Sequence, residues 1–211
     1  MRFEDWEPFY LEILKDFGYI RAEDERSARA LDECLGGKRT EPTTLSKLLS
    51  NKQVSVAGNA QSLAEELQTK EGVLICADEA TSIALGKGII PDVLVTDLDG
   101  RVKDQVLANK KGAIAVIHAH GDNVAAVKRW APQFEGSVVG TTQSRPFGRI
   151  YNFGGFTDGD RAVFLAHHFQ ASKISLLGFD FEHPSPKDEN PATKLRKLAW
   201  ARKLIQSIGV L

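Results

Sequence analysis

Pro91-Asp-Val-Leu-Val-Thr-Asp-Leu-Asp-Gly100 sets a short apolar run directly before two carboxylates. Apolar runs of similar length recur along the chain without the alternation of a strand that has one face in water, and helical patterns separate most of them. Such runs are typical of a parallel sheet that helices cover on both faces. The predicted strands are 54–58, 73–76, 93–95, 113–117, 137–139 and 174–177. The predicted helices between them are 62–68, 81–87, 102–109, 124–130 and 161–169.

Both ends of the chain are predicted to be helical. Residues 3–17 have one broad aromatic and aliphatic face, and a second helix over 22–35 stops at Gly36-Gly37. We interpret 38–43 as a linker and expect a closing amphipathic helix over 191–208. Residues 1–50 are therefore predicted to form a helical cap, and residues 51–211 an α/β catalytic domain. The expected fold class is α/β, with a Rossmann-like, mostly parallel sheet flanked by helices and a helical N-terminal region.

The composition narrows the class of protein. The 211 residues carry 27 Lys and Arg against 28 Asp and Glu, so no basic excess predicts binding to nucleic acid. The longest apolar runs, such as 113–117, are too short to span a bilayer, so no membrane partner is expected. The N-terminus has no signal-peptide pattern, which favours a cytoplasmic location. Cys34 and Cys76 are isolated and are expected to be reduced thiols.

Polar residues cluster where the predicted strands end. In open parallel sheets, ligands bind at that edge, so this placement indicates an enzyme more than a structural domain. The residues concerned are Asn59 after the first strand, Asp78 after the second, Asp97 and Asp99 after the third, His118 to Asp122 after the fourth, Thr141 to Gln143 after the fifth and Asp180 after the sixth.

Asp97 and Asp99 are two positions apart. In an extended chain they would project to the same side, about 6.5 Å apart. Two carboxylates at that distance repel each other unless a cation lies between them, and oxygen ligands of this kind suit Mg²⁺. A turn without any ligand is the alternative, because Asp and Gly are common turn residues.

Thr157-Asp-Gly-Asp160 fits the start of a helix, with Thr157 as N-cap and acids in the first turn. Capping alone would explain these residues. The preceding Gly154-Gly155 pair favours a phosphate site, because glycines let backbone N–H groups approach an anion closely. Acids beside such a site favour a phosphate bridged by a metal ion.

His118-Ala-His120-Gly-Asp122 has the His-x-His-x-Asp spacing of binuclear zinc hydrolases. That class continues with a further histidine where this chain has Asn123, so zinc is disfavoured. Asp122 either joins a Mg²⁺ cluster or caps the helix that begins near Val124, and at least one of the two histidines is expected to be structural. The Asp-Leu-Asp-Gly string also imitates the nucleophile box of haloacid-dehalogenase phosphatases, while the P-loop signature is absent.

Taken in order, several strings resemble the archaeal 6-hydroxymethyl-7,8-dihydropterin pyrophosphokinases. The resemblance covers about residues 54–183. The strings are Cys76 to Asp78, Pro91 to Gly100, His118 to Asn123, Gly140 to Gln143, Asn152 to Ala162 and Leu177 to Asp180. A more distant similarity is to thiamine pyrophosphokinases. One departure lies in the loop 58–63, which reads Gly-Asn-Ala-Gln-Ser-Leu where relatives often have Gly-Pro-Ser-Leu.

The resemblance implies Mg²⁺-dependent transfer of diphosphate from ATP to the hydroxymethyl group of a reduced pterin, releasing AMP, in tetrahydromethanopterin or folate-type biosynthesis. It implies Asp97, Asp99 and Asp158 as catalytic metal ligands, with Asp122 as a weaker candidate. A homodimer is expected by the same resemblance. A thiamine-like acceptor, a metal-dependent phosphohydrolase and a non-catalytic nucleotide-binding module stay open. The residues expected to bind substrate are Asn59, Asp78, His120, Thr142, Gln143, Gly154, Gly155, Thr157 and Asp180.

Overall fold

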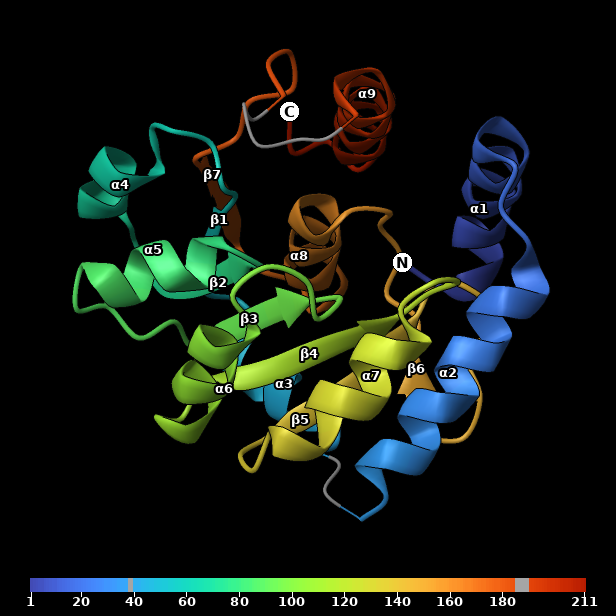
Figure 1. Cartoon of the computed structure of the whole chain (residues 1–211). Helices are drawn as coiled ribbons and strands as arrows, with labels where there is room; N and C mark the ends of the chain where they lie inside the picture. Colours follow the sequence, from blue (N-terminus) through green and yellow to red (C-terminus); the bar gives the residue numbers. More distant parts are fainter. Residues whose placement is uncertain (38–39, 185–189) are drawn as a thin grey trace.

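A computed structural model describes residues 1–37, 40–184 and 190–211. Its sheet of seven strands lies at the centre, between layers of helices (Figure 1). Every neighbouring pair of strands is parallel, and the strand order is β6-β5-β4-β3-β2-β1-β7. This confirms the predicted fold class and all six predicted strands. The strands are β1 Gln53–Ala57, β2 Val73–Ala77, β3 Val93–Thr96, β4 Ile114–Ala119, β5 Val138–Thr142, β6 Ile150–Tyr151 and β7 Lys173–Leu177. The two-residue β6, which has no apolar run of its own, was not predicted.

The predicted helices are also present. They are α1 Phe3–Phe17, α2 Arg21–Leu35, α4 Leu63–Glu66 with the 3₁₀ turn η1 Leu67–Thr69, α5 Ala80–Gly86, α6 Val102–Lys110, α7 Val124–Trp130, α8 Asp158–His168 and α9 Pro191–Ser207. A further helix, α3 Thr43–Leu49, and the 3₁₀ turn η2 Ala131–Gln133 were not predicted. The linker prediction is wrong at Thr43, which begins α3, while Lys38 and Arg39 lie outside the described residues.

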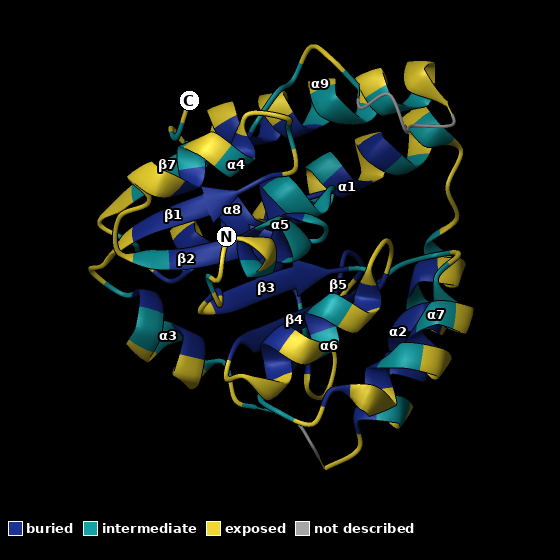
Figure 2. Ribbon diagram, turned by 60° about the vertical axis from the view of Figure 1, so that its left-hand side comes forward, coloured by how far each residue is buried: buried dark blue, intermediate teal, exposed yellow. Residues whose placement is uncertain are grey.

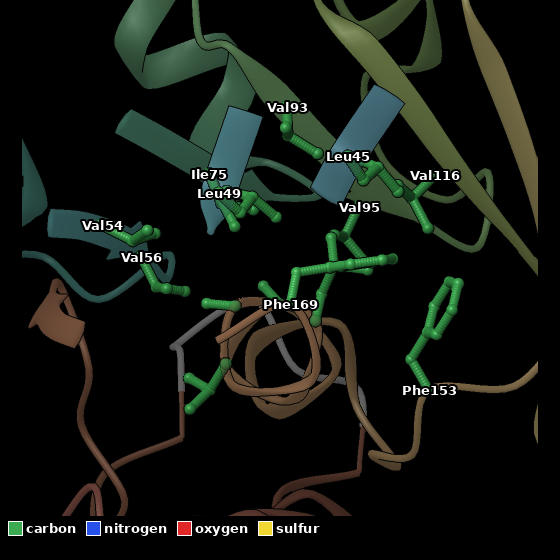
Figure 3. Close-up of a cluster of buried hydrophobic side chains, with 14 of the residues drawn as sticks. Leu45, Leu49, Val54, Val56, Ile75, Val93, Val95, Val116, Phe153 and Phe169 are labelled. Atoms are coloured by element: carbon green, nitrogen blue, oxygen red, sulfur yellow. The ribbon is translucent and has the colours of Figure 1, made fainter. Parts of the chain in front are cut away.

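The strands lack alternation because both of their faces are covered. On one face, Val54, Val56, Ile75, Val93 and Val95 point toward α3 and α8 (Figure 3). On the other face, the intervening residues of β3, β4 and β5 pack against α2, α6 and α7. The strands β1 to β5 are accordingly buried along almost their whole length, whereas the edge strand β7 is only partly buried and the outer sides of the helices are exposed (Figure 2). Burial on both sides is the physical reason that the strand sequences read as continuous apolar runs.

The three helices of residues 1–50 pack against different parts of the α/β region. The side chains of Trp6 and Tyr10 from α1 join Phe164 of α8 and Leu204 of α9 in one apolar cluster. The helix α2 lies against β4, β5 and α7, and α3 covers the opposite face of the sheet. These contacts bring α2 beside the carboxyl edge of the sheet. The separation into a cap and a catalytic domain stays a prediction. Within the described residues, no helix has the length and apolar character needed to cross a membrane.

Candidate active site

A cavity of about 850 Å³ opens at the carboxyl edge of the sheet. Its walls come from the loops after β1, β2, β3, β4, β5 and β7, from α2, from the start of α8 and from α9. Among the sequence-predicted residues, those that line it are Asn59, Asp78, Asp97, Asp99, His120, Asp122, Gln143, Thr157, Asp158 and Asp180. The parallel topology therefore gathers side chains that are up to 121 positions apart, from Asn59 to Asp180, around one hollow.

Three carboxylates meet in this cavity. Asp78 follows β2, Asp97 follows β3 and Asp158 is the first residue of α8, and each offers an oxygen within 4.8 Å of the other two. Across residues 1–37, 40–184 and 190–211, this is the one group of three or more His, Cys, Asp or Glu side chains close enough to share a metal ion. We call these three residues the acid cluster.

The second carboxylate of the Asp-Leu-Asp string does not join the acid cluster. The prediction that Asp97 and Asp99 project together from an extended chain is wrong, because β3 ends at Thr96 and Leu98 has a φ of 69°. This left-handed conformation is unusual for a residue with a branched side chain, and buried Leu98 holds it by packing in the core. Asp99 is exposed at the cavity rim, and its Oδ1 accepts a hydrogen bond of 2.6 Å from the backbone of Gly100.

Asp78 takes the place that the sequence suggested for Asp99. Its backbone also has a positive φ, of 44°, which Asp tolerates better than most residues. Its Oδ1 accepts a hydrogen bond of 2.6 Å from Nε2 of Gln105, a buried residue of α6. Gln105 Oε1 in turn accepts a hydrogen bond from the Thr96 hydroxyl at 2.8 Å. Gln105 was not predicted, because a polar residue in a helix carries no sign of what lies beside it.

His120 lies between two carboxylates. Its Nε2 is 3.1 Å from Asp97 Oδ2, and its Nδ1 is 3.1 Å from Asp122 Oδ1. Burial alone would lower the pKa of His120, but the hydrogen bonds to Asp122 and Asp97 outweigh burial and raise it to about 9. Burial also opposes ionisation of Asp97, whereas the hydrogen bond and charge of His120 reverse this effect and lower the pKa of Asp97. The histidine is therefore a cation that keeps Asp97 ionised.

Asp122 is at the edge of the site. Its side chain is 93% exposed, and it is not part of the acid cluster. Asn123, and not Asp122, is the N-cap residue of α7. The other histidine of the string, His118, is buried, and its Nδ1 is 3.1 Å from the hydroxyl of Thr141. His118 therefore has the structural place that was expected for one of the two histidines.

The electrostatics of the acid cluster favour an added cation. Burial and the charge of Asp97 raise the pKa of Asp158 to about 7. Burial, followed by the charges of Asp158, Asp97 and Asp99, raises the pKa of Asp78 well above its ordinary value. In addition, Asp97 Oδ1 is buried without a hydrogen-bond partner among the described residues. Three carboxylates that repel one another, one of them with an unpartnered buried oxygen, fit Mg²⁺, which prefers oxygen ligands.

One positive side chain is built into the site beside Asp158. The Nη1 atom of Arg161 is 3.1 Å from Asp158 Oδ1, and the arginine side chain is only 7% exposed. Its Nη2 donates to Gln143 Oε1 at 3.3 Å. Lys197 of α9 also lines the cavity, with its Nζ 6.0 Å from the ring centroid of Phe156. Neither residue was among the predicted site residues, although Arg161 follows the Asp158-Gly-Asp160 string directly.

Thr157 is the N-cap of α8, as predicted, and forms a capping box with Asp160. The carboxylate of Asp160 accepts hydrogen bonds from the backbone of Phe156 at 2.6 Å and of Thr157 at 2.7 Å. Asp160 is completely buried, and this second acid of the string holds the start of the helix and is not part of the acid cluster. Thr157 itself lines the cavity.

The structure does not bring Thr142, Gly154 or Gly155 to the cavity wall. Thr142 belongs to β5, is buried, and its hydroxyl accepts from the backbone of Ser144. The two glycines have φ values of 88° and 91° and lie against α8. A Cβ at Gly155 would be 2.5 Å from the Cα of Arg161, and one at Gly154 would be 2.5 Å from the ring of Phe164. Their lack of side chains serves helix packing, and their assignment to phosphate approach stays a prediction.

The opposite end of the cavity is formed by the loops after β1 and β7. Asn59 is exposed at this end, and Phe179 packs beside Gly58 and Gly159. Asp180 Oδ1 accepts hydrogen bonds of 2.9 Å from the backbone of Glu182 and of His183. Asp180 thus closes its own turn and also lines the cavity.

Comparison with known proteins shows the family of the chain. The profile of the 6-hydroxymethylpterin diphosphokinase MptE-like family matches residues 33–185. Three archaeal proteins named 6-hydroxymethyl-7,8-dihydropterin pyrophosphokinase align over almost the whole chain. The protein of Pyrococcus furiosus is 43% identical, over 98% of this chain and 94% of its own. That of Methanothermobacter thermautotrophicus is 40% identical, over 97% and 94%, and that of Methanocaldococcus jannaschii is 35% identical, over 97% and 95%. The chain therefore belongs to the MptE-like family of 6-hydroxymethylpterin diphosphokinases.

Proposed function

We propose that this protein is a diphosphotransferase that moves the terminal diphosphate of ATP, with Mg²⁺, onto the hydroxymethyl group of 6-hydroxymethyl-7,8-dihydropterin and releases AMP. The observation that carries the proposal is the acid cluster of Asp78, Asp97 and Asp158 inside a cavity of about 850 Å³. A cavity of that size is at the upper end of the range for small-molecule sites, as two substrates require. The names of the family and of its three relatives support the pterin acceptor.

In the proposed reaction, the acid cluster would hold Mg²⁺, which would supply positive charge to the phosphate oxygens. The pterin hydroxyl oxygen forms a bond to the β-phosphorus, and the bond from that phosphorus to the oxygen bridging it to the α-phosphorus breaks. AMP leaves with that oxygen, and the hydroxyl proton passes to a nearby carboxylate or water. Because little covalent chemistry falls to the protein, the residues act mainly by orienting the two substrates and neutralising charge.

Two features of the walls suit this pair of substrates. The side chains of Lys194 and Lys197 on α9 line the cavity and can face a triphosphate that the acid cluster alone would repel. Phe156, Phe179 and Tyr19 provide aromatic surface for flat rings. Both substrates carry such a ring, so the aromatic walls do not assign either substrate to one end.

The test uses purified protein with ATP, Mg²⁺ and the reduced hydroxymethylpterin. We expect AMP and the pterin diphosphate in equal amounts, measured by ³¹P NMR and liquid chromatography. Release of ADP or inorganic phosphate in place of AMP would reject diphosphate transfer, and phosphate release without acceptor would favour a phosphohydrolase. AMP formation with thiamine but not with the pterin would reassign the acceptor. Binding of ATP without turnover would favour a non-catalytic module.

We place the product in tetrahydromethanopterin or folate-type cofactor biosynthesis, because a diphosphate ester is an activated group for a following displacement by a nucleophile. A homodimer and a cytoplasmic location stay predictions. The dimer is tested by light scattering coupled to gel filtration, in which a mass near twice 23.2 kDa is expected.

A further inference from the structure

Asp24 of α2 is a carboxylate that is only 2% exposed. Its Oδ1 accepts hydrogen bonds from the backbone of Gly121 at 2.7 Å and from Nε2 of Gln143 at 3.0 Å. Its Oδ2 accepts a hydrogen bond of 2.6 Å from the hydroxyl of Tyr10 on α1. Buried carboxylates occur almost only where they are paired. Asp24 borders the cavity, but both of its oxygens are already occupied by partners from within the protein.

The chain of contacts continues from Asp24 to the acid cluster. Gln143 donates to Asp24 through Nε2 and accepts from Arg161 Nη2 through Oε1, at 3.3 Å. Arg161 Nη1 then lies 3.1 Å from Oδ1 of Asp158. The two ends of the Gln143 amide therefore have different partners, a carboxylate and a guanidinium, which together allow only one orientation of the amide. The Gln143 backbone carbonyl is held as well, by Trp6 Nε1 at 2.9 Å.

We propose that Asp24 is a positioning residue of the active site, which acts through Gln143 and Arg161 to hold Asp158 in place in the acid cluster. Only the kinetic test of this inference rests on the proposed function, because the metal-binding test needs no substrate. It gives Asp24 of α2 a supporting role in the active site and assigns Gln143 a supporting role as well, in place of the substrate contact expected from the sequence. Asp24 comes from α2, Gln143 from the loop after β5 and Arg161 from α8, so only the folded chain joins them.

The physical reason is the rigidity of a buried network of hydrogen bonds. The guanidinium of Arg161 is planar, so fixing one of its terminal nitrogens through Gln143 also fixes the direction of the other toward Asp158. Such networks are worth more than the sum of their separate hydrogen bonds. Metal-binding carboxylates depend on outer partners of this kind, and loss of such a partner typically costs about 10- to 100-fold in metal affinity or activity.

The test compares four single variants of the full chain. Gln143→Met keeps the length of the side chain but removes both of its polar ends, and Asp24→Ala removes the far anchor. Asp24→Asn keeps an oxygen that can accept from Gly121 and Gln143. Glu25→Gln is the matched control, because Glu25 is the next residue of α2 and its Oε1 is 3.5 Å from Ser144 Oγ, which is not on the path from Asp24 through Gln143 and Arg161 to Asp158. Circular dichroism and thermal melting establish that each variant folds.

The first readout is Mn²⁺ binding by electron paramagnetic resonance without substrates, and the second is kcat and the KM for the pterin. We expect Gln143→Met and Asp24→Ala to weaken Mn²⁺ binding and lower kcat by about tenfold or more, with the pterin KM unchanged. Asp24→Asn is expected to keep Mn²⁺ affinity and kcat within about threefold of the parent, as is Glu25→Gln. Recovery by Asp24→Asn supports a geometric role over a charge effect.

The inference is overturned if the parent protein binds no Mn²⁺, or if Gln143→Met binds it as tightly as the parent. If Gln143→Met raises only the KM for the pterin, the inference is also overturned, because Gln143 would then contact the substrate. If Asp24→Ala does not fold, the result for Gln143→Met decides whether the inference holds. Weaker Mn²⁺ binding in a protein that forms no AMP with any acceptor would reject the proposed function and leave the positioning role supported.

Discussion

The imidazole of His120 is bonded to Asp97 on one side, with Nε2 3.1 Å from Oδ2, and to Asp122 on the other. One of its partners belongs to the acid cluster and the other is exposed to water. The protein thus carries an internal cation beside three converging carboxylates, which reduces their repulsion before any metal ion binds.

This relationship predicts the titration of His120. In metal-free protein, NMR should show a His120 pKa of about 9, above the ordinary 6.5. Burial lowers this pKa, but the hydrogen bonds to Asp122 and Asp97 outweigh burial. Asp122→Asn removes one of the two anionic partners and should lower the pKa of His120. As a control, the pKa of His168, which burial holds below its ordinary value, should not change. A parent His120 that titrates near 6.5 would contradict the ion pairs.

The acid cluster includes Asp97 but not Asp99, so the two residues should differ in their effect on kcat. Asp97→Asn should lower kcat by more than roughly 100-fold while circular dichroism stays unchanged, because it replaces one charged ligand of the acid cluster by a neutral amide. Asp99→Asn should leave kcat within about threefold, because the Asp99 side chain is exposed at the rim. Activity measured as AMP formation checks both variants. Equal loss in the two would restore the sequence-based view that both carboxylates bind the metal ion.

The raised pKa of Asp158 predicts a pH dependence of stability. A carboxyl group whose pKa rises from 3.8 to about 7 on folding stabilises the protein fully below about pH 4, and this contribution is lost as the pH rises through about 7. The loss is no more than roughly 4 kcal/mol. Urea unfolding in EDTA should show that the free energy of unfolding falls less between about pH 5 and about pH 8 in Asp158→Asn than in the parent.

The same experiment with Mg²⁺ provides a control. Binding of the ion to the folded state alone should raise the free energy of unfolding of the parent at about pH 8. The gain should be much smaller in Asp158→Asn, which lacks one of the three carboxylates. If the free energy of unfolding depends on pH equally in the two proteins, ionisation of Asp158 does not destabilise the folded state.

The close contact between Gly155 and α8 predicts that a side chain at this position lowers the stability of the fold through poor packing. Gly155→Ala has to keep a φ of 91° and place a Cβ 2.5 Å from the Cα of Arg161, so both strain and overlap arise. Gly18→Ala is the matched control, because Gly18 also has a positive φ, of 69°, but has no atom within 4 Å of the added Cβ. Urea unfolding should show that Gly155→Ala costs about 1–3 kcal/mol more than Gly18→Ala. Equal costs would show that α8 can shift freely.

Much of the fold could be predicted, because the signals for it are local. The apolar run at 93–95 and its counterparts reveal a sheet buried on both faces, and the Thr157 cap reveals the start of α8. The short elements α3 and β6 were missed. The helix α3 has only Leu45 and Leu49 to bury, and β6 is a strand only because two residues pair with β5.

The candidate site could be predicted only in part. In each of the two acidic strings, the first carboxylate joins the acid cluster and the second does not. Asp99 is turned outward by the left-handed backbone at Leu98, and Asp160 is used to cap α8. The spacing of apolar and polar residues predicts neither outcome. The position of Asp99 depends on how Leu98 packs in the core, and Asp160 can either cap α8 or face the cavity.

Residue order and polarity alone therefore determined that acids, amides and histidines gather at one edge of a parallel sheet, because strand periodicity and strand ends are properties of neighbouring residues. Only the tertiary structure decided that Asp78 completes the acid cluster and that Asp24 reaches Asp158 through Gln143 and Arg161. Hydrogen bonds between elements depend on distances in space, which separation along the chain does not specify.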